Sequence, residues 1–194
     1  MPGRNRAPGR VRIVGGMWKR TPIVVADRAG LRPTPDRVRE TLFNWLSSLR
    51  PDIGNLRGLD LFAGTGALGF ELASRGARSV LLVEQDTRLV ARLVELRKRL
   101  GAQQIEILTG EALTIAARLP PGGFDIVFLD PPFGSGVLSA ALERMPALLA
   151  PLGLVYAESD ASIEPGRAGE LGLTVVRTGR AGKVRFHLLQ KDAS

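Results

Sequence analysis

The stretch from Leu59 to Glu71 constrains the fold most tightly, because an apolar strand pattern runs directly into glycines at 64, 66 and 69 and then into a helical pattern. The spacing is G-x-G-x-x-G, and Glu84 follows twenty residues after Gly64, where a ribose ligand is expected in nucleotide-binding folds. Glycines at such a turn let a nucleoside approach the backbone beside a helix N-terminus. By this spacing alone, a nicotinamide dehydrogenase is one interpretation.

Short strands alternate with helical segments through most of the chain. Hydrophobic periodicity predicts strands at 56–62, 79–84, 104–108 and 124–129, and helices at 67–75, 87–100, 111–118 and 137–149. Later strands are predicted at 152–158, 171–178 and 183–190, the last two as an antiparallel hairpin through Gly179–Gly182. The alternation implies parallel pairing through right-handed crossovers. We therefore predict an α/β fold with a seven-stranded, mostly parallel sheet and helices on both faces, with ligands at the carboxyl ends of the strands.

A second apolar run, Phe124 to Leu129, ends in Asp130-Pro131-Pro132-Phe133. A prolyl nitrogen carries no hydrogen, and the residue before a proline is pushed toward extended geometry. Asp130 is therefore expected at the mouth of a strand, beside a rigid turn that presents a carboxylate, outward-facing carbonyls and the ring of Phe133. An exocyclic amine on a nucleobase needs acceptors for its N–H hydrogens and a ring to stack on. The turn offers both.

Three features favour methyl transfer over hydride transfer. Asp60 stands four residues before the first glycine, and its carboxylate suits a cationic amino group but would repel a pyrophosphate. The Asp-Pro-Pro-Phe turn has no role in hydride transfer, and the chain is short for a dehydrogenase that also needs a substrate domain. Together with Glu84, these motifs resemble the Rossmann-like class I S-adenosylmethionine-dependent methyltransferases that act on exocyclic amines.

Composition fits an enzyme with one main domain. The chain has 194 residues, enough to bury a full core, and it has no cysteine. A disulfide framework and a thiolate metal site are thereby excluded, and we expect no metal site of another kind. Methylation at carbon 5 of a pyrimidine in the usual way is excluded too, because it needs a cysteine nucleophile. The basic N-terminus lacks the apolar core of a signal peptide, so a cytoplasmic location without membrane contact is expected.

The positive charge is concentrated in the first 50 residues. They hold eleven Lys or Arg residues against three acids, whereas the other 144 residues hold sixteen of each sign. This pattern predicts a phosphate-binding arm on a neutral catalytic domain, although a solvated basic tail would show the same composition. We divide the chain into a disordered tail at 1–9, an RNA-binding hairpin and helix at 10–50, and a catalytic domain at 51–194. Within 10–50, strands are expected at 11–15 and 21–26 around Gly15-Gly16, and a helix at 36–49 with Thr34 or Asp36 as its cap.

One segment of the chain restricts the resemblance from this broad class of methyltransferases to a single family. The sequence from Leu31 to Leu46, with Arg37-Val38-Arg39-Glu40 at its centre, resembles the signature of the RsmD family of bacterial 16S ribosomal RNA guanine methyltransferases. Arg12-Ile13-Val14-Gly15-Gly16, the glycine turn, the Asp-Pro-Pro-Phe turn and Ala181-Gly182-Lys183-Val184 match in the same order. Pro35, where the family commonly has threonine, and Gly110-Glu111, in place of the common Ala-Asp, depart from the pattern.

The resemblance implies methylation of the 2-amino group of one guanine, position 966 of 16S rRNA, on the small ribosomal subunit or its assembly intermediate. S-adenosylmethionine is the implied cofactor, and a monomer is expected. The residues expected at the cofactor are Asp60, Phe62, Gly64, Gly66, Glu84, Gln85, Glu111 and Ala112. The expected catalytic residues are Asp130, Pro131, Pro132 and Phe133, and the expected RNA contacts are Arg10, Arg12, Lys19, Arg20, Arg32, Arg37 and Arg39.

Other interpretations stay open at this point. An adenine 6-amino methyltransferase of DNA or RNA would use the same Asp-Pro-Pro-Phe chemistry. A non-catalytic RNA-binding assembly factor would retain the fold without the reaction. Glu40 and Asn44 lie one helical turn apart and face either the cleft or solvent. His187, the only histidine, is expected to serve packing.

Overall fold

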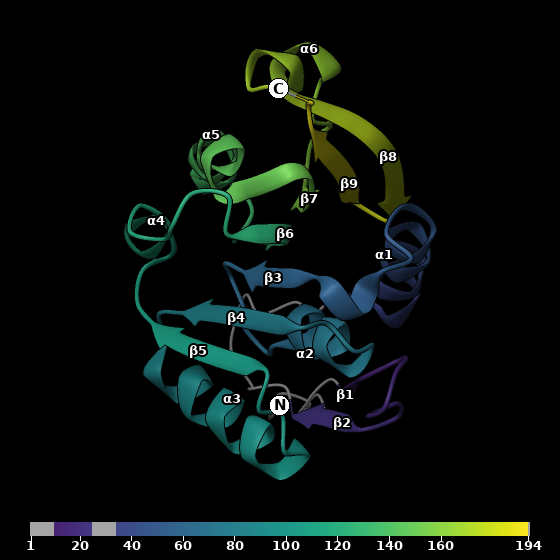
Figure 1. Ribbon diagram of the computed structural model, residues 1–194, viewed down its shortest axis with the longest axis vertical. Coiled ribbons are helices and arrows are strands. Elements are labelled where there is room, and N and C mark those ends of the chain that lie inside the picture. The colour runs from purple at the N-terminus through teal and green to yellow at the C-terminus, as the bar shows by residue number, and fades with distance from the viewer. Residues whose placement is uncertain (1–9, 25–33, 194) are drawn as a thin grey trace, which may run out of the picture.

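The computed structural model describes residues 10–24 and 34–193, and its centre is a seven-stranded sheet (Figure 1). The strands are β3 Arg57–Asp60, β4 Ser79–Glu84, β5 Ile105–Thr109, β6 Phe124–Leu129, β7 Leu149–Ser159, β8 Leu173–Ala181 and β9 Val184–Lys191. Their order is β5-β4-β3-β6-β7-β9-β8. Strands β3 to β7 pair in parallel, and β9 pairs antiparallel with both β7 and β8. The predicted mostly parallel sheet is confirmed.

Helices cover both faces of the sheet (Figure 1). Helices α1 Asp36–Leu49, α2 Ala67–Ser74 and α3 Thr87–Leu100 pack into one apolar core, and α4 Ala112–Ala116, α5 Val137–Leu148 and α6 Pro165–Glu170 into the other. Strand β6 serves both cores, since Phe128 enters the first and Val127 the second. Alternation of side chains along a strand buried on both sides explains why its sequence is almost continuously apolar. Within the described ranges, no helix is long and apolar enough to cross a membrane.

Most predicted boundaries agree with the structure to within one or two residues, and the exceptions have local causes. Helix α6 was not predicted, because Pro-Gly-Arg-Ala-Gly-Glu has poor helix formers and only Ala168 is buried. Strand β8 continues to Ala181, so the hairpin turns at Gly182 and Lys183 rather than through Gly179. A short 3₁₀ turn, η1 Ile53–Asn55, precedes β3. At α1 the N-cap is Pro35, and no side chain caps the helix.

The N-terminal strands β1 Arg10–Arg12 and β2 Pro22–Val24 form the predicted antiparallel hairpin. Strand β1 ends three residues earlier than expected, and residues 25 and 26 of the second predicted strand lie outside the described residues. Their connection is fastened to the C-terminal end of α2. Ser74 accepts from the backbone N–H of Met17 at 2.8 Å and donates its hydroxyl to the carbonyl of Gly15 at 2.7 Å. Gly16 has a φ of +76°, and a Cβ there would lie 1.9 Å from the Ser74 carbonyl oxygen. Glycine is therefore required by both conformation and space.

A buried ionic network joins the hairpin, α1 and α2. Glu71 on α2 and Arg39 on α1 are both fully buried, and Nη1 of Arg39 lies 3.6 Å from Oε2 of Glu71. The same carboxylate accepts from the backbone N–H of Val14 at 2.6 Å and pairs with Arg75 at 2.9 Å. Arg39 also binds Asp36 at 2.6 Å. Since a buried charge is costly unless it is paired, each member of the network depends on the others.

We expect Glu71→Ala to lower the free energy of unfolding by about 3–5 kcal/mol, because it removes the fully buried counter-charge of Arg39 and leaves the partly exposed Asp36. Denaturant unfolding followed by circular dichroism measures the loss. Glu143→Ala is the matched control, since Glu143 pairs with Arg167 at 2.9 Å where both side chains are half exposed. Such a surface pair contributes about 0–1 kcal/mol. Equal losses in the two variants would show that the buried network does not carry the stability assigned to it.

Candidate active site

Three acidic residues meet at the carboxyl edge of the sheet. Asp60 ends β3, Glu84 ends β4, and Asp130 directly follows β6, and these three strands are neighbours in the sheet. In the paired register, Asp60 lies opposite Leu82 of β4 and Phe128 of β6, so Glu84 and Asp130 both extend two residues beyond it. The structure thus brings together the three carboxylates that the motifs singled out. This is the edge at which open α/β sheets bind ligands.

The glycine turn is held to the neighbouring strand by Glu84. Gly64 and Gly66 have φ values of +52° and +79°, the left-handed region that favours glycine. The Gly64 N–H donates to Oε2 of Glu84 at 2.9 Å, and the Asp86 N–H donates to Oε1 at 2.8 Å. A carboxylate offers about four lone-pair sites. Glu84 therefore retains capacity for further donors, such as the two hydroxyls of a ribose.

Asp60 lies beneath the same turn and is only 2% exposed. Its Oδ2 accepts from the Gly69 N–H in the first turn of α2 at 3.0 Å. Burial raises the pKa of Asp60 to about 7, opposed by that N–H bond and reinforced by the negative charge of Glu84. A Cβ on Gly69 would lie 2.2 Å from Leu82, so glycine is what lets α2 approach the sheet and reach Asp60. A buried acid with so high a pKa is suited to a cationic ligand.

The Asp-Pro-Pro-Phe turn presents acceptors and a ring, as its sequence predicts. Pro131 is buried, while Phe133 is 46% exposed at the surface. The Pro132 carbonyl accepts from the Ser135 hydroxyl at 2.7 Å. Among the described residues, none donates a hydrogen bond to the Pro131 carbonyl. Asp130 and Pro131 therefore offer an adjacent carboxylate and carbonyl for a donor with two hydrogens.

Behind Asp130 lies a polar cluster that sequence reasoning missed. Oε1 of Glu158, at the end of β7, accepts from the hydroxyls of Thr34 at 2.7 Å and Tyr156 at 2.8 Å. Thr34 Oγ1 also lies 3.4 Å from Oδ2 of Asp130. Thr34 was expected as a helix cap, but here its side chain links α1's start to the site. Burial, then repulsion from Glu158 and Asp60, raises the pKa of Asp130 well above its ordinary value.

The remaining predicted cofactor residues lie near this edge with different exposures. Phe62 is half buried just after β3, and Gln85 is exposed just after β4. Glu111 is exposed and caps α4, since it accepts from the N–H groups of Leu113 at 2.9 Å and Thr114 at 2.7 Å. Its contact with Thr114, followed by the backbone bonds, lowers the pKa of Glu111. Its role as the N-cap of α4 is enough to account for a carboxylate at this position. Its contact with a cofactor stays a prediction. Ala112 is buried.

Five of the seven predicted RNA contacts are described with their side chains. Lys19, Arg20 and Arg37 are exposed, and Arg12 is exposed but pairs with Asp36 at 2.9 Å. Arg39 requires a correction, because its side chain is fully buried in the network with Glu71 and cannot reach RNA. Arg10 lies in β1, and Arg32 lies outside the described residues. Glu40 and Asn44 are exposed on α1.

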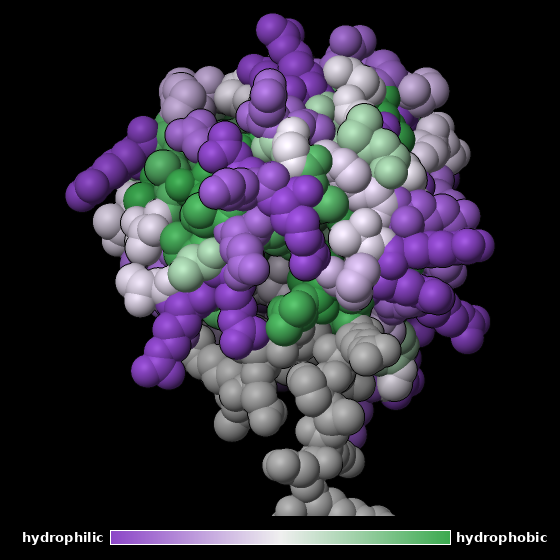
Figure 2. Space-filling view, turned by 90° about the horizontal axis from the view of Figure 1, so that it is seen from below, coloured by the Kyte–Doolittle hydropathy of each residue, from purple (hydrophilic) through white to green (hydrophobic). Residues whose placement is uncertain are grey.

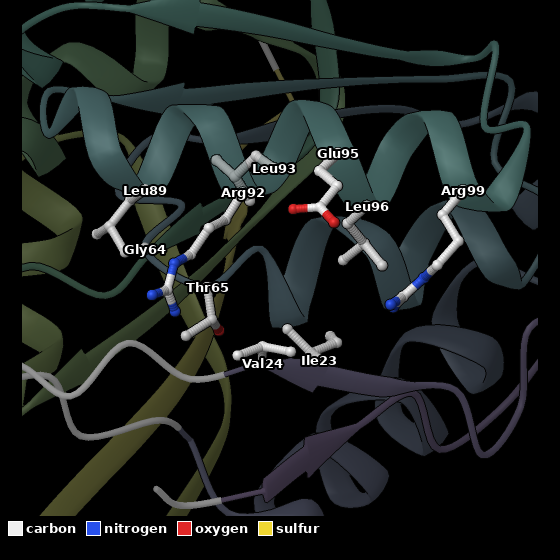
Figure 3. A pocket seen from close by; sticks show the side chains of 10 residues that line it. All are labelled: Ile23, Val24, Gly64, Thr65, Leu89, Arg92, Leu93, Glu95, Leu96 and Arg99. Carbon is white, nitrogen blue, oxygen red and sulfur yellow. The ribbon is translucent and has the colours of Figure 1, made fainter.

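A groove runs between α3 and β2 and reaches the glycine turn at Gly64 and Thr65 (Figure 3). Its volume is about 290 Å³, and Ile23, Leu93 and Leu96 supply part of its apolar lining. Arg92 extends from α3 toward Thr65, and Arg99 donates to the Pro22 carbonyl at 3.0 Å (Figure 3). Seen from below, hydrophilic side chains surround a strip of hydrophobic surface (Figure 2). The groove includes neither Glu84 nor Asp130, so it borders the site without containing the reactive groups.

Comparison with known proteins agrees with this geometry. The model of a family described as "Conserved hypothetical protein 95" matches residues 11–190. The chain is 38% identical to ribosomal RNA small subunit methyltransferase D of Escherichia coli K12 over 95% of this chain and 92% of that protein. It is 34% identical to the putative rRNA methyltransferase YlbH of Bacillus subtilis, over 84% of this chain and 91% of that protein.

Solved structures show the same fold. The putative methyltransferase yhhF from Escherichia coli superposes with a TM-score of 0.82 at 35% identity, covering 96% of this chain and all of that chain. The putative methylase HI0767 from Haemophilus influenzae superposes with a TM-score of 0.76 at 32% identity, covering 95% of this chain and 99% of that chain. The match over nearly the full length, in sequence and in structure, shows that the chain has the class I S-adenosylmethionine-dependent methyltransferase fold and belongs to the RsmD family.

Proposed function

We propose that this protein transfers a methyl group from S-adenosylmethionine to the 2-amino group of a guanine in 16S ribosomal RNA, position 966, in the small subunit or its assembly intermediate. The observation that carries the proposal is the adjacent pair of acceptors at the sheet edge that also holds Glu84. They are the Asp130 carboxylate and the Pro131 carbonyl, to which no residue of the described ranges donates a hydrogen bond. The names of the relatives, as rRNA methyltransferases, support an RNA substrate. We propose that it acts as a monomer in the cytoplasm.

The residues at the edge fit this cofactor. S-adenosylmethionine supplies an electrophilic methyl group on a positively charged sulfonium and also carries an ammonium group. Asp60, whose burial raises its pKa to about 7, would gain a cation that favours its ionised form. Glu84 has spare lone pairs for the ribose hydroxyls, and the left-handed glycines let the ligand approach the backbone. Phe62, Gln85, Glu111 and Ala112 are proposed to flank the rest of the cofactor.

The turn would then orient the reacting amine. Asp130 and the Pro131 carbonyl accept its two hydrogens, which directs the nitrogen lone pair toward the methyl group, and the exposed Phe133 ring stacks on the base. As the N–C bond forms, the bond from sulfur to the methyl carbon would break and leave a neutral thioether. The nitrogen must also release one proton, and Asp130 would hold or pass that proton. The raised pKa of Asp130 makes its carboxylate a better proton acceptor than an ordinary aspartate. Alignment and exclusion of water supply the rest of the acceleration, without a strong base.

The N-terminal part, residues 10–50, is proposed as the RNA-binding unit. Lys19, Arg20 and Arg37 are exposed on it, and Arg12 is exposed beside Asp36. Arginine and lysine contacts to phosphates position an RNA without reading its sequence. The buried network that holds the hairpin against α1 and α2 would keep these charges in a fixed relation to the site.

Nucleoside analysis decides the target. The protein is incubated with labelled S-adenosylmethionine and small-subunit particles that lack the modification, and the RNA is then digested and its nucleosides identified by mass spectrometry. We expect 2-methylguanosine. Recovery of 6-methyladenosine would retain the fold and the turn's chemistry but replace guanine with adenine. No incorporation, with intact cofactor binding, would instead favour the non-catalytic assembly factor.

Asp130→Asn and Glu84→Ala are expected to separate chemistry from cofactor binding. Asp130→Asn keeps the size of the side chain but replaces one oxygen with a hydrogen-bond donor, so turnover should fall on the order of a hundredfold while cofactor affinity stays within a few-fold. Glu84→Ala removes charge-assisted bonds worth about 1.5–3 kcal/mol each and should weaken cofactor binding tenfold or more. Calorimetry without RNA and single-turnover assays with particles measure the two effects. A folded Asp130→Asn variant with near-normal turnover would remove Asp130 from the mechanism.

Cofactor affinity is expected to fall as pH is lowered through about 7, where Asp60 becomes protonated. A cationic ligand favours the ionised acid, so below this pKa the dissociation constant should rise by up to about tenfold per pH unit. The measurement is calorimetric titration between about pH 5.5 and 7.5, below the range in which an α-amino group titrates. Asp60→Asn, which can still accept from Gly69, should bind more weakly and lose this pH dependence. An affinity that does not change with pH would place the ammonium elsewhere.

A further inference from the structure

The β8–β9 hairpin carries two arginines that the proposed function leaves unused. Arg180 on β8 lies directly opposite Arg185 on β9 in the antiparallel register. Like charges in such cross-strand pairs destabilise a sheet. Arg180 donates to the Gly182 carbonyl at 2.9 Å, and within the described part of the chain no carboxylate lies within ion-pairing distance of either guanidinium. The pair therefore carries positive charge that nothing in the described structure neutralises.

Protection of a sheet edge does not account for both residues. Charged side chains on an edge strand prevent unwanted pairing with other chains, and β8 is such a strand. Arg177 and Arg180, both exposed on β8, suffice for that purpose. Arg185 is half buried on β9, which lies between β7 and β8 and has no free edge. Its charge requires another explanation.

The two arginines line an open pocket of about 420 Å³. Thr178, Ser162 and His187 also line it, and Glu164 lies at it without pairing with either arginine. The Ile163 N–H donates to Nε2 of His187 at 3.2 Å, which ties the loop after β7 to the pocket's wall. Burial, and then the charge of Arg185, lowers the pKa of His187, so the ring is uncharged at neutral pH. The positive charge of the pocket comes from the arginines.

The pocket lies on the same edge of the sheet as the proposed base site. Arg185 pairs in register with Ser159, which follows Glu158 at the end of β7. Asp130 follows β6 on the other side of β7. Adjacent strands are about 4.8 Å apart, so the backbones of Arg185 and Asp130 lie roughly 10 Å apart across the sheet. Their side chains leave opposite faces at this edge, because Arg185 alternates with Phe186 of the first core and Asp130 with Leu129 of the second. In Figure 1, β8 and β9 are the yellow strands below α6, at the far end of the sheet from β5 and the hairpin.

We propose that Arg180 and Arg185 bind a backbone phosphate of the RNA next to the target nucleotide. The proposal rests on the proposed function, because it takes the polyanion to be the RNA whose base enters beside Asp130. Guanidinium groups bind phosphate oxygens through paired hydrogen bonds, and the hydroxyls of Thr178 and Ser162 are further donors of the kind that phosphates accept. The RNA would be held on both sides of the base, by the N-terminal arm and by this pocket.

The test compares Arg180→Gln/Arg185→Gln with Arg78→Gln/Arg118→Gln. The control removes the same charge from two exposed arginines outside the pocket, one directly before β4 and one between α4 and β6. Binding to unmodified small-subunit particles is measured against salt concentration. Loss of both arginines should reduce the log–log slope by about 0.7 to 0.9, the value for one neutralised phosphate, while the control keeps the native slope. Affinity for S-adenosylmethionine should not change in either variant.

Thermal unfolding and the single histidine give independent readings. Removing the like-charge pair should leave the melting temperature unchanged or higher, whereas a merely structural role would lower it.

Because His187 is the only histidine, its imidazole signals in NMR spectra are unambiguous. Adding a short oligoribonucleotide should shift those signals and raise the pKa of His187 in the native protein but not in the double variant. The same titration with inorganic phosphate shows whether a free anion or the RNA backbone is the ligand that the pocket prefers.

Three results would overturn the proposal: a native salt slope in the double variant, an equal loss in the control, or a preference for inorganic phosphate over RNA. These readings do not depend on methyl transfer. If the slope falls but the nucleoside analysis finds another product, the phosphate site stands and the target base is wrong. If 2-methylguanosine forms and the slope is native, the proposed function stands and the phosphate site is wrong.

Discussion

The buried contact between Glu71 and Arg39 is the interaction on which the placement of the N-terminal part depends. The hairpin, α1 and α2 come from separate stretches of the chain, and one carboxylate accepts from the Val14 N–H and from Arg75 and lies 3.6 Å from Arg39. Apolar packing alone would tolerate small shifts between these elements, because it is not directional. Hydrogen bonds to a buried charge fix both distance and orientation, since a misplaced donor leaves a charge unpaired in the interior.

That fixed relation matters at the sheet edge, because Thr34 lies two residues before α1. Its hydroxyl reaches Glu158 and approaches Asp130, so the position of α1 determines what surrounds the Asp-Pro-Pro-Phe turn. The guanidinium of Arg39 also donates to the Thr34 carbonyl at 3.4 Å. The buried network and the polar cluster behind Asp130 are thus joined through one residue. A change in the network would therefore move the backbone at Thr34, and with it the hydroxyl that contacts Glu158 and Asp130, as well as alter the local charge.

The carboxyl edge of the sheet brings several carboxylates together, which destabilises the protein when no ligand is bound. Burial raises the pKa values of both Asp60 and Asp130, and repulsion adds to it, from Glu84 at Asp60 and from Glu158 and Asp60 at Asp130. Their ionised forms are therefore disfavoured there. Such arrangements are typical of functional sites, because a ligand of opposite charge relieves the repulsion when it binds. The surrounding surface has the opposite sign, with exposed arginines and lysines on the hairpin, on α3 and on the β8–β9 turn. An acidic site within a basic surface suits a cationic cofactor and a polyanionic substrate together.

The sequence by itself determined the α/β sheet, most element boundaries and the three carboxylates that meet at the sheet edge. Local patterns suffice for these, since apolar runs predict buried strands, glycines at 64, 66 and 69 permit the turn and the close approach of α2, and prolines at 131 and 132 restrict the backbone. Arg39 shows the limit of such reasoning. Composition placed it among the RNA contacts, and only the packing of α1 against α2 revealed a buried partner of Glu71.

Tertiary structure alone decided the contacts between distant segments. Thr34, Tyr156 and Glu158 meet Asp130 because β7 lies beside β6 and α1 begins above them, and no local pattern records that meeting. The opposition of Arg180 and Arg185 likewise depends on a hairpin register that is set by a turn at Gly182 rather than through Gly179. Side-chain pairing across strands changes completely when the register shifts by one residue. Periodicity therefore predicts which elements form, whereas the fold decides which of their charges come together.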